Sequence, residues 1–181
     1  MSQVGLEVGC GAAWVPDGGF AVGLDVDIAQ LRSAPGVVVC GDARHLPLAV
    51  GSTDRIVLRA VLHHLDPIDE ALGELSRVAA PGALLMIVDA VALPPEQARR
   101  MNEQLEAAGR SPEPLAGLDP DDVAASLGRH GFDVDSIRLD GTATLATRPI
   151  VSEDHVTDRF VLQATRRERA GQPRRPSSTA K

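Results

Sequence analysis

The sequence is poor in aromatic residues, with no Tyr, one Trp and three Phe among 181 residues. Few aromatic rings leave few platforms on which nucleic acid bases can stack. The net charge of −7 also lacks the excess of Lys and Arg that a phosphate-binding surface needs. We therefore expect no nucleic acid partner.

Cysteine is equally scarce, since Cys10 and Cys40 are the only two. One lies in a glycine-rich turn and the other at the end of an apolar run, a pattern that makes no disulfide framework. Neither lies at metal-ligand spacing with His or carboxylate side chains. We expect two reduced thiols and no bound metal.

Long hydrophobic runs are missing too, because no apolar stretch reaches the length of a membrane span. No basic segment followed by an apolar one precedes the first strand-like run, as a secretory signal would require. We expect a cytoplasmic protein without a membrane partner. The length suits one domain over residues 1–165, followed by a disordered, basic, Pro-rich and Ser-rich tail over residues 166–181.

What the sequence does have is a regular series of apolar runs. Continuous apolar runs are typical of strands that are buried on both faces of a parallel sheet. There are five of them: Val4–Val8, Phe20–Leu24, Val37–Cys40, Arg55–Leu58 and Leu84–Val88. Two later segments, Val134–Leu139 and Phe160–Thr165, alternate as the final strands of a mixed sheet do. We predict an α/β fold with seven strands.

Amphipathic helices are predicted between these strands. Asp66 is placed to cap a helix that Pro67 opens, and Pro81-Gly82 is expected to stop it. A second helix begins at Asp119-Pro120 and ends before Gly131. Helices that alternate with buried strands favour an open parallel sheet.

The most informative motif is the glycine run after the first strand. Read as the dinucleotide pattern G-x-G-x-x-G, the run has Trp14 in place of the third glycine, where an indole prevents close packing of helix and strand. Shifted by one, it reads Glu7-x-Gly9-x-Gly11-x-Ala13. In this form it resembles the first motif of the class I S-adenosylmethionine-dependent methyltransferases, with Ala13 at the usual third glycine.

Further segments extend the resemblance to the small-molecule branch of that family. They are Gly41–Leu48, Asp54–Leu58, Val61–Leu65, Glu74–Val78 and Pro81-Gly82. The resemblance implies a Rossmann-like methyltransferase fold, in which a mostly parallel seven-stranded sheet ends in an antiparallel hairpin. It also implies S-adenosyl-L-methionine as the cofactor.

The resemblance assigns a role to each matching position. The methionine end of the cofactor would be lined by Glu7, Gly9, Cys10 and Gly11, and its ammonium group would donate to the carbonyl of Arg59. Asp25 would accept from both ribose hydroxyls. At the adenine end, Val26 would pack on the base, and Asp42 and the backbone of Ala43 would bind it. The ends of parallel strands converge on one crevice, where such sheets bind ligands.

Candidate catalytic residues follow the fourth strand. His63 and His64 lie there, and a histidine near neutral pKa is the natural base for a hydroxyl or amine acceptor. We prefer His64. The alternative is that one histidine caps the next helix while the other packs. Cys10, near a helix start, is a second alternative as the nucleophile of another enzyme class.

Two departures from the family pattern concern the surroundings of the crevice. Only ten residues separate Gly9 from Phe20, which predicts a shortened first crossover. No helices precede the first strand, which predicts no N-terminal cap and an open crevice. A partner subunit or a second copy of the chain would then cover it, or the charged helix expected from Pro94-Pro95 to Gly109 would act as a lid. That helix is equally well interpreted as a solvated connection.

We therefore expect a methyltransferase that acts on a small organic acceptor by direct displacement. The alternatives are a protein of this fold that uses the cofactor without methyl transfer, in a cyclisation or rearrangement, and a non-catalytic binding or partner subunit.

Overall fold

The computed structural model describes residues 4–12, 20–112, 117–144 and 156–168, and every structural statement below concerns these parts of the chain. The strands are β1 (Val4–Val8), β2 (Phe20–Asp25), β3 (Val38–Cys40), β4 (Thr53–Arg59), β5 (Ala79–Ala90), β6 (Phe132–Thr144) and β7 (Val156–Arg166). The helices are α1 (Ile28–Leu31), the 3-10 turn η1 (Leu62–His64), α2 (Ile68–Val78), α3 (Pro95–Ala107) and α4 (Pro120–Arg129).

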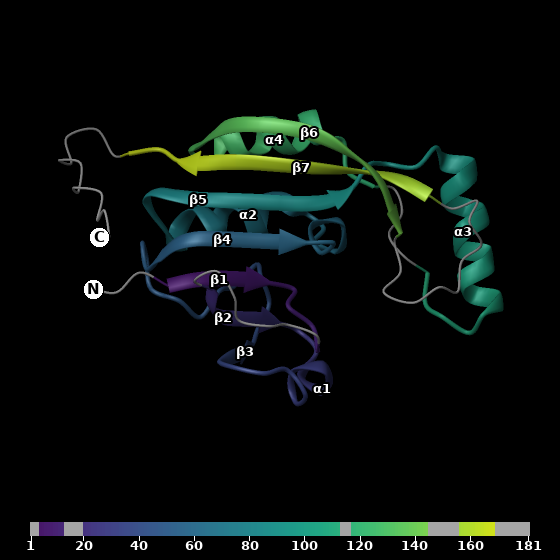
Figure 1. Ribbon diagram of the computed structural model, residues 1–181, viewed down its shortest axis with the longest axis horizontal. Coiled ribbons are helices and arrows are strands. Elements are labelled where there is room, and N and C mark those ends of the chain that lie inside the picture. The colour runs from purple at the N-terminus through teal and green to yellow at the C-terminus, as the bar shows by residue number, and fades with distance from the viewer. Residues whose placement is uncertain (1–3, 13–19, 113–116, 145–155, 169–181) are drawn as a thin grey trace.

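These strands form one seven-stranded sheet in the order β3-β2-β1-β4-β5-β7-β6 (Figure 1). Strands β1 to β5 are parallel to one another. Strand β7 runs antiparallel to both β5 and β6. The predicted mostly parallel sheet with a closing antiparallel hairpin is confirmed. The strand order reverses between β1 and β4, the place where open α/β sheets form a ligand crevice at the carboxyl ends of their strands.

The start of β5 differs from the prediction. The strand begins at Ala79, directly after α2 ends at Val78, and therefore contains Pro81 and Gly82. The helix ends just before this pair, as predicted, but the pair lies inside β5 and not in a turn between helix and strand. A register shift in the pairing of β4 with β5 lies between Thr53 and Arg55, so this part of the ladder is irregular and tolerates a proline.

The start of α2 also corrects a prediction. The N-cap residue is Pro67, in extended conformation, and no side chain caps this helix end. Asp66 is therefore not the cap. Asp69 and Glu70 lie in the first turn, where carboxylates interact favourably with the helix dipole.

The other two long helices begin as predicted. Asp119 caps α4 by accepting from the backbone N–H of Asp121, and Pro120 is the first helical residue. Helix α3 follows Pro94 and ends one residue before Ala108. It lies beyond the ends of the strands that point toward it (Figure 1). The short α1 was not predicted, because its four residues carry no helical periodicity.

The main core lies between the sheet and the helices α2 and α4, which cover the same face of it (Figure 1). Fully buried core residues include Leu6, Ile56, Leu72, Leu75, Ile87, Leu127, Phe132 and Phe160. A separate small cluster joins Met101 and Leu105 of α3 with Leu93 and Ala98. These apolar side chains are therefore the part of α3 that packs.

Several predicted features lie outside the described residues. These are Ala13, Trp14 and the rest of the first crossover up to residue 19, and the tail from residue 169 onward. The described chain runs past the expected boundary at residue 165, since Arg166 ends β7 and Arg167 donates to Asp133. None of the described helices is long and apolar enough to cross a membrane.

Candidate functional site

The glycine turn after β1 packs closely against the loop that follows β4. Gly9 and Gly11 have φ angles of 70° and 58°, a region that favours glycine. A Cβ atom on Gly9 would lie 2.5 Å from Cγ2 of Val61. The backbone N–H groups of Gly9 and Cys10 both donate to the carbonyl of Leu24. These contacts bring the ends of β1, β2 and β4 together.

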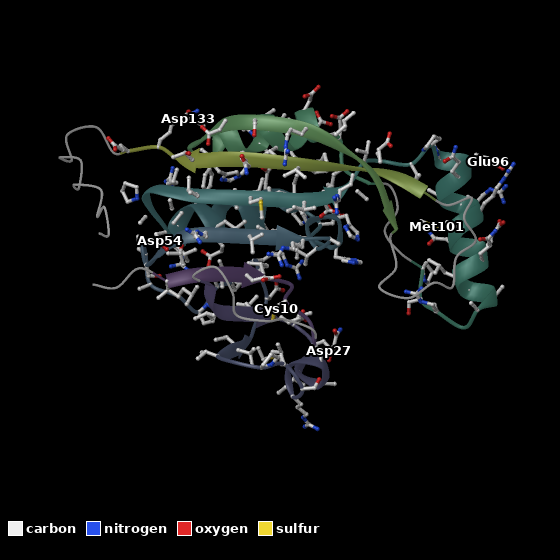
Figure 2. The ribbon with its side chains drawn as sticks, viewed as in Figure 1. Cys10, Asp27, Asp54, Glu96, Met101 and Asp133 are labelled. Atoms are coloured by element: carbon white, nitrogen blue, oxygen red, sulfur yellow. The ribbon has the colours of Figure 1, made fainter. Side chains whose placement is uncertain are left out.

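Asp25, at the end of β2, joins that turn to the start of α1. Its Oδ2 accepts from the N–H of Gly11 and its Oδ1 from the N–H of Asp27, each at 2.9 Å. A carboxylate has about four acceptor sites, so Asp25 retains capacity for further donors. This geometry fits an acceptor for ribose hydroxyls beside the glycine turn. Figure 2 shows Cys10 and Asp27 at this same end of the sheet.

Asp42, after β3, is held by a neighbour that the sequence did not single out. Arg44 donates to its two oxygens through the backbone N–H, Nε and Nη2, the last at 2.7 Å. These bonds, with the nearby positive charge, lower the pKa of Asp42 to about 2. Of the two other residues predicted to contact adenine, Val26 is 73% exposed and Ala43 is buried. Arg44 therefore competes with adenine for the Asp42 carboxylate, which the family pattern assigns to the adenine amino group.

Glu7 and Arg59 form an ion pair across the ends of β1 and β4. Nη1 of Arg59 lies 3.3 Å from Oε1 of Glu7. The Glu7 side chain is buried, whereas that of Arg59 is about half exposed. The predicted role of Arg59 used its backbone alone. Its side chain also pairs with the buried Glu7 carboxylate.

The two histidines differ sharply in their surroundings. Nδ1 of His63 lies 2.6 Å from Oδ1 of Asp89, and both side chains are buried. Asp89 also accepts from the N–H of Leu62 at 2.9 Å and from that of Ala90 at 2.8 Å. His64 is exposed, and its ring centroid lies 4.0 Å from that of His63. Sequence reasoning missed Asp89, although its place at the end of a buried strand was a usable signal.

Cys10 does not have the properties of a nucleophile. Burial, then the charges of Asp25 and Glu7, raises the pKa of its thiol to about 11. A thiol with this pKa is protonated at neutral pH, and the protonated form is unreactive because the nucleophile is the thiolate. The arrangement disfavours the alternative of a cysteine enzyme. Within the parts of the chain that are described, no group of three His, Cys, Asp or Glu side chains is placed to hold a metal ion.

Together these contacts bring Glu7, Gly9, Gly11, Asp25 and Arg59 to the point where the strand order reverses, with Asp42 at the neighbouring strand end. A glycine turn, a half-buried carboxylate with spare acceptor capacity and a partly buried ion pair are the chemistry that a ribose and a charged amino acid group require. The residues therefore fit S-adenosylmethionine. The departure is Arg44 at the adenine end.

Comparison with known proteins supports the class that this fold and site define. A family profile described as a methyltransferase domain matches residues 6–87. The chain is 35% identical over 99 residues to a demethylmenaquinone methyltransferase of Roseiflexus sp. (strain RS-1), in a match that covers 46% of this chain and 41% of the relative. The chain thus spans about two fifths of that relative's length.

Solved structures share the whole fold. A putative methyltransferase from Bacillus halodurans superposes with a TM-score of 0.67 at 17% identity, over 92% of this chain and 93% of that one. The [4+2]-cyclase SpnF superposes with a TM-score of 0.66 at 17% identity, over 91% and 76%. Residues 6–87 thus match a methyltransferase domain, and the described chain has the fold of these solved structures.

Proposed function

We propose that the chain transfers a methyl group from S-adenosylmethionine to a small organic acceptor by direct displacement. The observation that carries the proposal is the convergence of Glu7, Asp25 and the glycine turn on the crevice between β1 and β4. The name of the Roseiflexus relative specifies a small molecule, demethylmenaquinone, as what that protein methylates, which favours a small acceptor here.

The chain's residues have distinct binding tasks in this proposal. Asp25 accepts the ribose hydroxyls, and the glycine turn lets the cofactor approach the backbone. The ion pair of Glu7 with Arg59 balances the buried carboxylate beside the methionine end. Asp42 accepts from the adenine amino group once Arg44 shares the carboxylate or turns away from it. Cofactor affinity therefore depends on Arg44.

The bound cofactor supplies an electrophilic methyl group on its sulfonium. The protein's main task is to hold an acceptor atom in line with that group, and orientation of this kind contributes about 7–11 kcal/mol. A base on the protein is needed only for acceptors that must lose a proton.

We assign the two histidines different roles. His63 and Asp89 form a positioning pair, because both side chains are buried and bind each other. The pair fixes η1 and thereby the neighbouring His64, which is exposed and accessible to an acceptor. His64 is the candidate base for a hydroxyl or amine acceptor.

The test is calorimetric titration of the protein with S-adenosylmethionine and with its demethylated product. We expect saturable binding that Asp25→Asn abolishes, because the variant loses the acceptor for the ribose hydroxyls. Asp54→Asn is the matched control, since Asp54 is an exposed carboxylate at the other end of β4 (Figure 2). An absence of binding at millimolar cofactor contradicts the proposal.

A second candidate function uses the bound cofactor without transferring its methyl group. The structural likeness to a [4+2]-cyclase shows that this fold also serves reactions of other types, so a cyclisation or rearrangement is the alternative. Product mass separates the two candidates, because a gain of one methyl group identifies transfer and an unchanged mass identifies rearrangement.

A binding or partner subunit without catalysis is the third candidate, and it predicts that Asp25→Asn leaves the chain's biological function unchanged.

The proposal also includes a cover for the crevice. Helix α3 extends from the carboxyl end of β5, and its buried Met101 and Leu105 belong to the small apolar cluster with Leu93 and Ala98. We propose that α3, a second copy of the chain or a partner subunit closes the site when the acceptor binds. Cofactor-dependent protection of α3 from hydrogen exchange supports the first possibility. A cofactor-dependent change of mass in solution supports the other two.

A further inference from the structure

The carboxylates around the cofactor crevice fall into two groups that differ in charge balance. Glu7 and Asp42 each form an ion pair with an arginine. Asp25 and Asp27 do not, because within the described chain no Arg or His side chain lies at ion-pair distance from either of them. Arg32, the next cation along the sequence, lies at the other end of α1 from Asp27. Two negative charges at this edge of the sheet are therefore not balanced by an ion pair.

Asp25 is held by neutral donors alone. Its Oδ2 accepts from the backbone N–H of Gly11 and its Oδ1 from that of Asp27, each at 2.9 Å. Backbone N–H groups satisfy the carboxylate oxygens without supplying a positive charge. The negative charge of Asp25 therefore remains at the place of the proposed ribose site.

Asp27 is fixed in place although it is exposed. It is the N-cap residue of α1, where its Oδ1 accepts from the backbone N–H of Ala29 at 2.8 Å and its Oδ2 from Nε2 of Gln30 at 3.3 Å. The pKa of Asp27 is lowered, chiefly by the hydrogen bond from Ala29, so the side chain is ionised at neutral pH. Gln30 also reaches the glycine turn, since a Cβ atom on Gly11 would lie 3.2 Å from its Oε1. These contacts hold the Asp27 charge beside that turn (Figure 2).

The thiol of Cys10 reports the sign of the electrostatic potential in the glycine turn. Its pKa is raised to about 11, first by burial and then by the charges of Asp25 and Glu7. Of these two charges, that of Asp25 has the larger effect, and Glu7 is the one that pairs with Arg59. A negative potential opposes the formation of a thiolate and attracts a cation. The turn is therefore a favourable environment for positive charge.

The cofactor and its product differ in charge at the sulfur atom. The sulfonium of S-adenosylmethionine is positive, whereas the sulfur of the demethylated product is an uncharged thioether, because the electron pair of the broken bond stays on sulfur. The ribose, the adenine and the amino acid group are the same in both ligands. Nearby carboxylates therefore attract the cofactor more strongly than the product.

We propose that Asp25 and Asp27 give the crevice a preference for the positively charged cofactor over its uncharged product, an inference that rests on the proposed function. Asp25 also binds the ribose of either ligand, whereas Asp27 acts only through its charge. A charge at a solvated rim has a modest effect, so Asp27 contributes about threefold to the preference at low ionic strength. The loss of this attraction after transfer favours the exchange of product for fresh cofactor.

The test compares the affinities for S-adenosylmethionine and for its demethylated product, by calorimetric titration of the full chain at low and at high ionic strength. The measured quantity is the ratio of the two affinities, from which contacts that both ligands make cancel. We expect the ratio to fall about threefold in Asp27→Asn, through weaker binding of the cofactor. We also expect the ratio to fall as salt is added, because ions screen an exposed charge.

Asp27→Asn removes the charge and keeps the cap, because Asn caps a helix as well as Asp does. The side-chain oxygen of Asn can still accept from the N–H of Ala29, so we expect the fold to be retained, which the free energy of unfolding checks. Asp54→Asn is the matched control. It removes an exposed carboxylate at the opposite end of β4 and leaves the ratio as in the unchanged protein.

The possible failures are distinguishable. A ratio that neither Asp27→Asn nor salt changes overturns the inference, and it leaves the proposed function intact because both ligands still bind. Equal weakening of both ligands by Asp27→Asn also overturns the inference, since Asp27 would then shape the site without acting on the ligand's charge. Failure of both ligands to bind at millimolar concentration contradicts the proposed function, and the inference with it.

Discussion

His63 and Asp89 connect the loop after β4 to the end of β5 through a 2.6 Å contact between Nδ1 and Oδ1. Asp89 is buried and accepts from two backbone N–H groups as well, one in η1 and one in β5. A buried carboxylate with three donors holds its surroundings firmly, because removing any partner leaves a desolvated polar atom. The pair therefore fixes the loop that carries His64.

The first prediction separates the two histidines by their effect on stability. His63→Gln lowers the free energy of unfolding by about 1–3 kcal/mol, since the buried Asp89 carboxylate loses one of its three donors. His64→Gln changes it by less than about 0.5 kcal/mol, because His64 is exposed. Urea denaturation of both variants measures this. Equal losses would show that His63 does not have the anchoring role assigned to it.

The second prediction compares two glycines of similar backbone conformation. Gly9 has a φ of 70° and Gly82 a φ of 79°, so replacement by Ala strains both. Only Gly9 has a neighbour in the way, Cγ2 of Val61, whereas a Cβ on Gly82 meets nothing within 4 Å. We expect Gly82→Ala to cost about 1 kcal/mol. Gly9→Ala is expected to cost about 1–3 kcal/mol more.

Thermal unfolding of the two glycine variants, measured side by side, tests this prediction. A further replacement, Val61→Ala, removes the two methyl groups nearest to Gly9 and should recover part of the loss in the Gly9→Ala protein. No recovery, or equal costs at the two glycines, would mean that the turn does not pack against the loop as described.

Much of the fold was predictable because it depends on local patterns. The run Val4–Val8 is a strand with the predicted boundaries, and Asp119-Pro120 starts α4 as its capping chemistry requires. The predictions failed where tertiary pairing overrides local propensity. Pro81 and Gly82 indicated a helix stop, yet β5 extends back through them because β4 offers a pairing partner with a register shift.

The site shows the same division. Asp25 lies beside the glycine turn as the motif predicted, because both follow adjacent parallel strands. Arg44 was missed because a hydrogen bond to a carboxylate two positions earlier leaves no periodic trace in the sequence. The place of Asp89 at a strand end was a signal, but its pairing with His63, 26 positions away, was not readable. Arg77 and Arg166 are 89 positions apart in the numbering but line one cavity. A hydrogen bond from Arg166 to the carbonyl of Ser76 joins the end of α2 to the end of β7.

The third prediction concerns the reactivity of the two cysteines. Cys10 is buried with a pKa raised to about 11, whereas Cys40 is exposed. A thiol reagent at neutral pH should therefore modify one cysteine per folded chain, and peptide mapping should place it at Cys40. Cys10 should react only after unfolding or in strongly alkaline solution, where its thiolate forms. Modification of Cys10 first would contradict the protonated thiol that the structure indicates.

The last prediction concerns the acid stability that Asp42 and Arg44 share. The pKa of Asp42 in the folded protein, about 2, lies below its ordinary value of about 3.9, so the unfolded chain binds its proton first as pH falls. The contribution is therefore fully present above about pH 4 and is lost as the pH falls toward about 2. Partial exposure of both side chains allows solvent screening and keeps the contribution below about 1 kcal/mol.

A double-mutant cycle with Asp42→Asn and Arg44→Gln isolates this contribution, because other groups that titrate in acid cancel from it. The coupling energy, measured by urea denaturation, should be favourable at neutral pH, smaller in high salt and close to zero near pH 2. The same Arg44→Gln protein should bind S-adenosylmethionine more tightly than the unchanged chain, since the Asp42 carboxylate no longer has the guanidinium as a competitor. A coupling energy independent of pH would exclude an ionic contribution from the pair, and weaker cofactor binding by Arg44→Gln would show that Arg44 orients Asp42 for the adenine instead of competing with it.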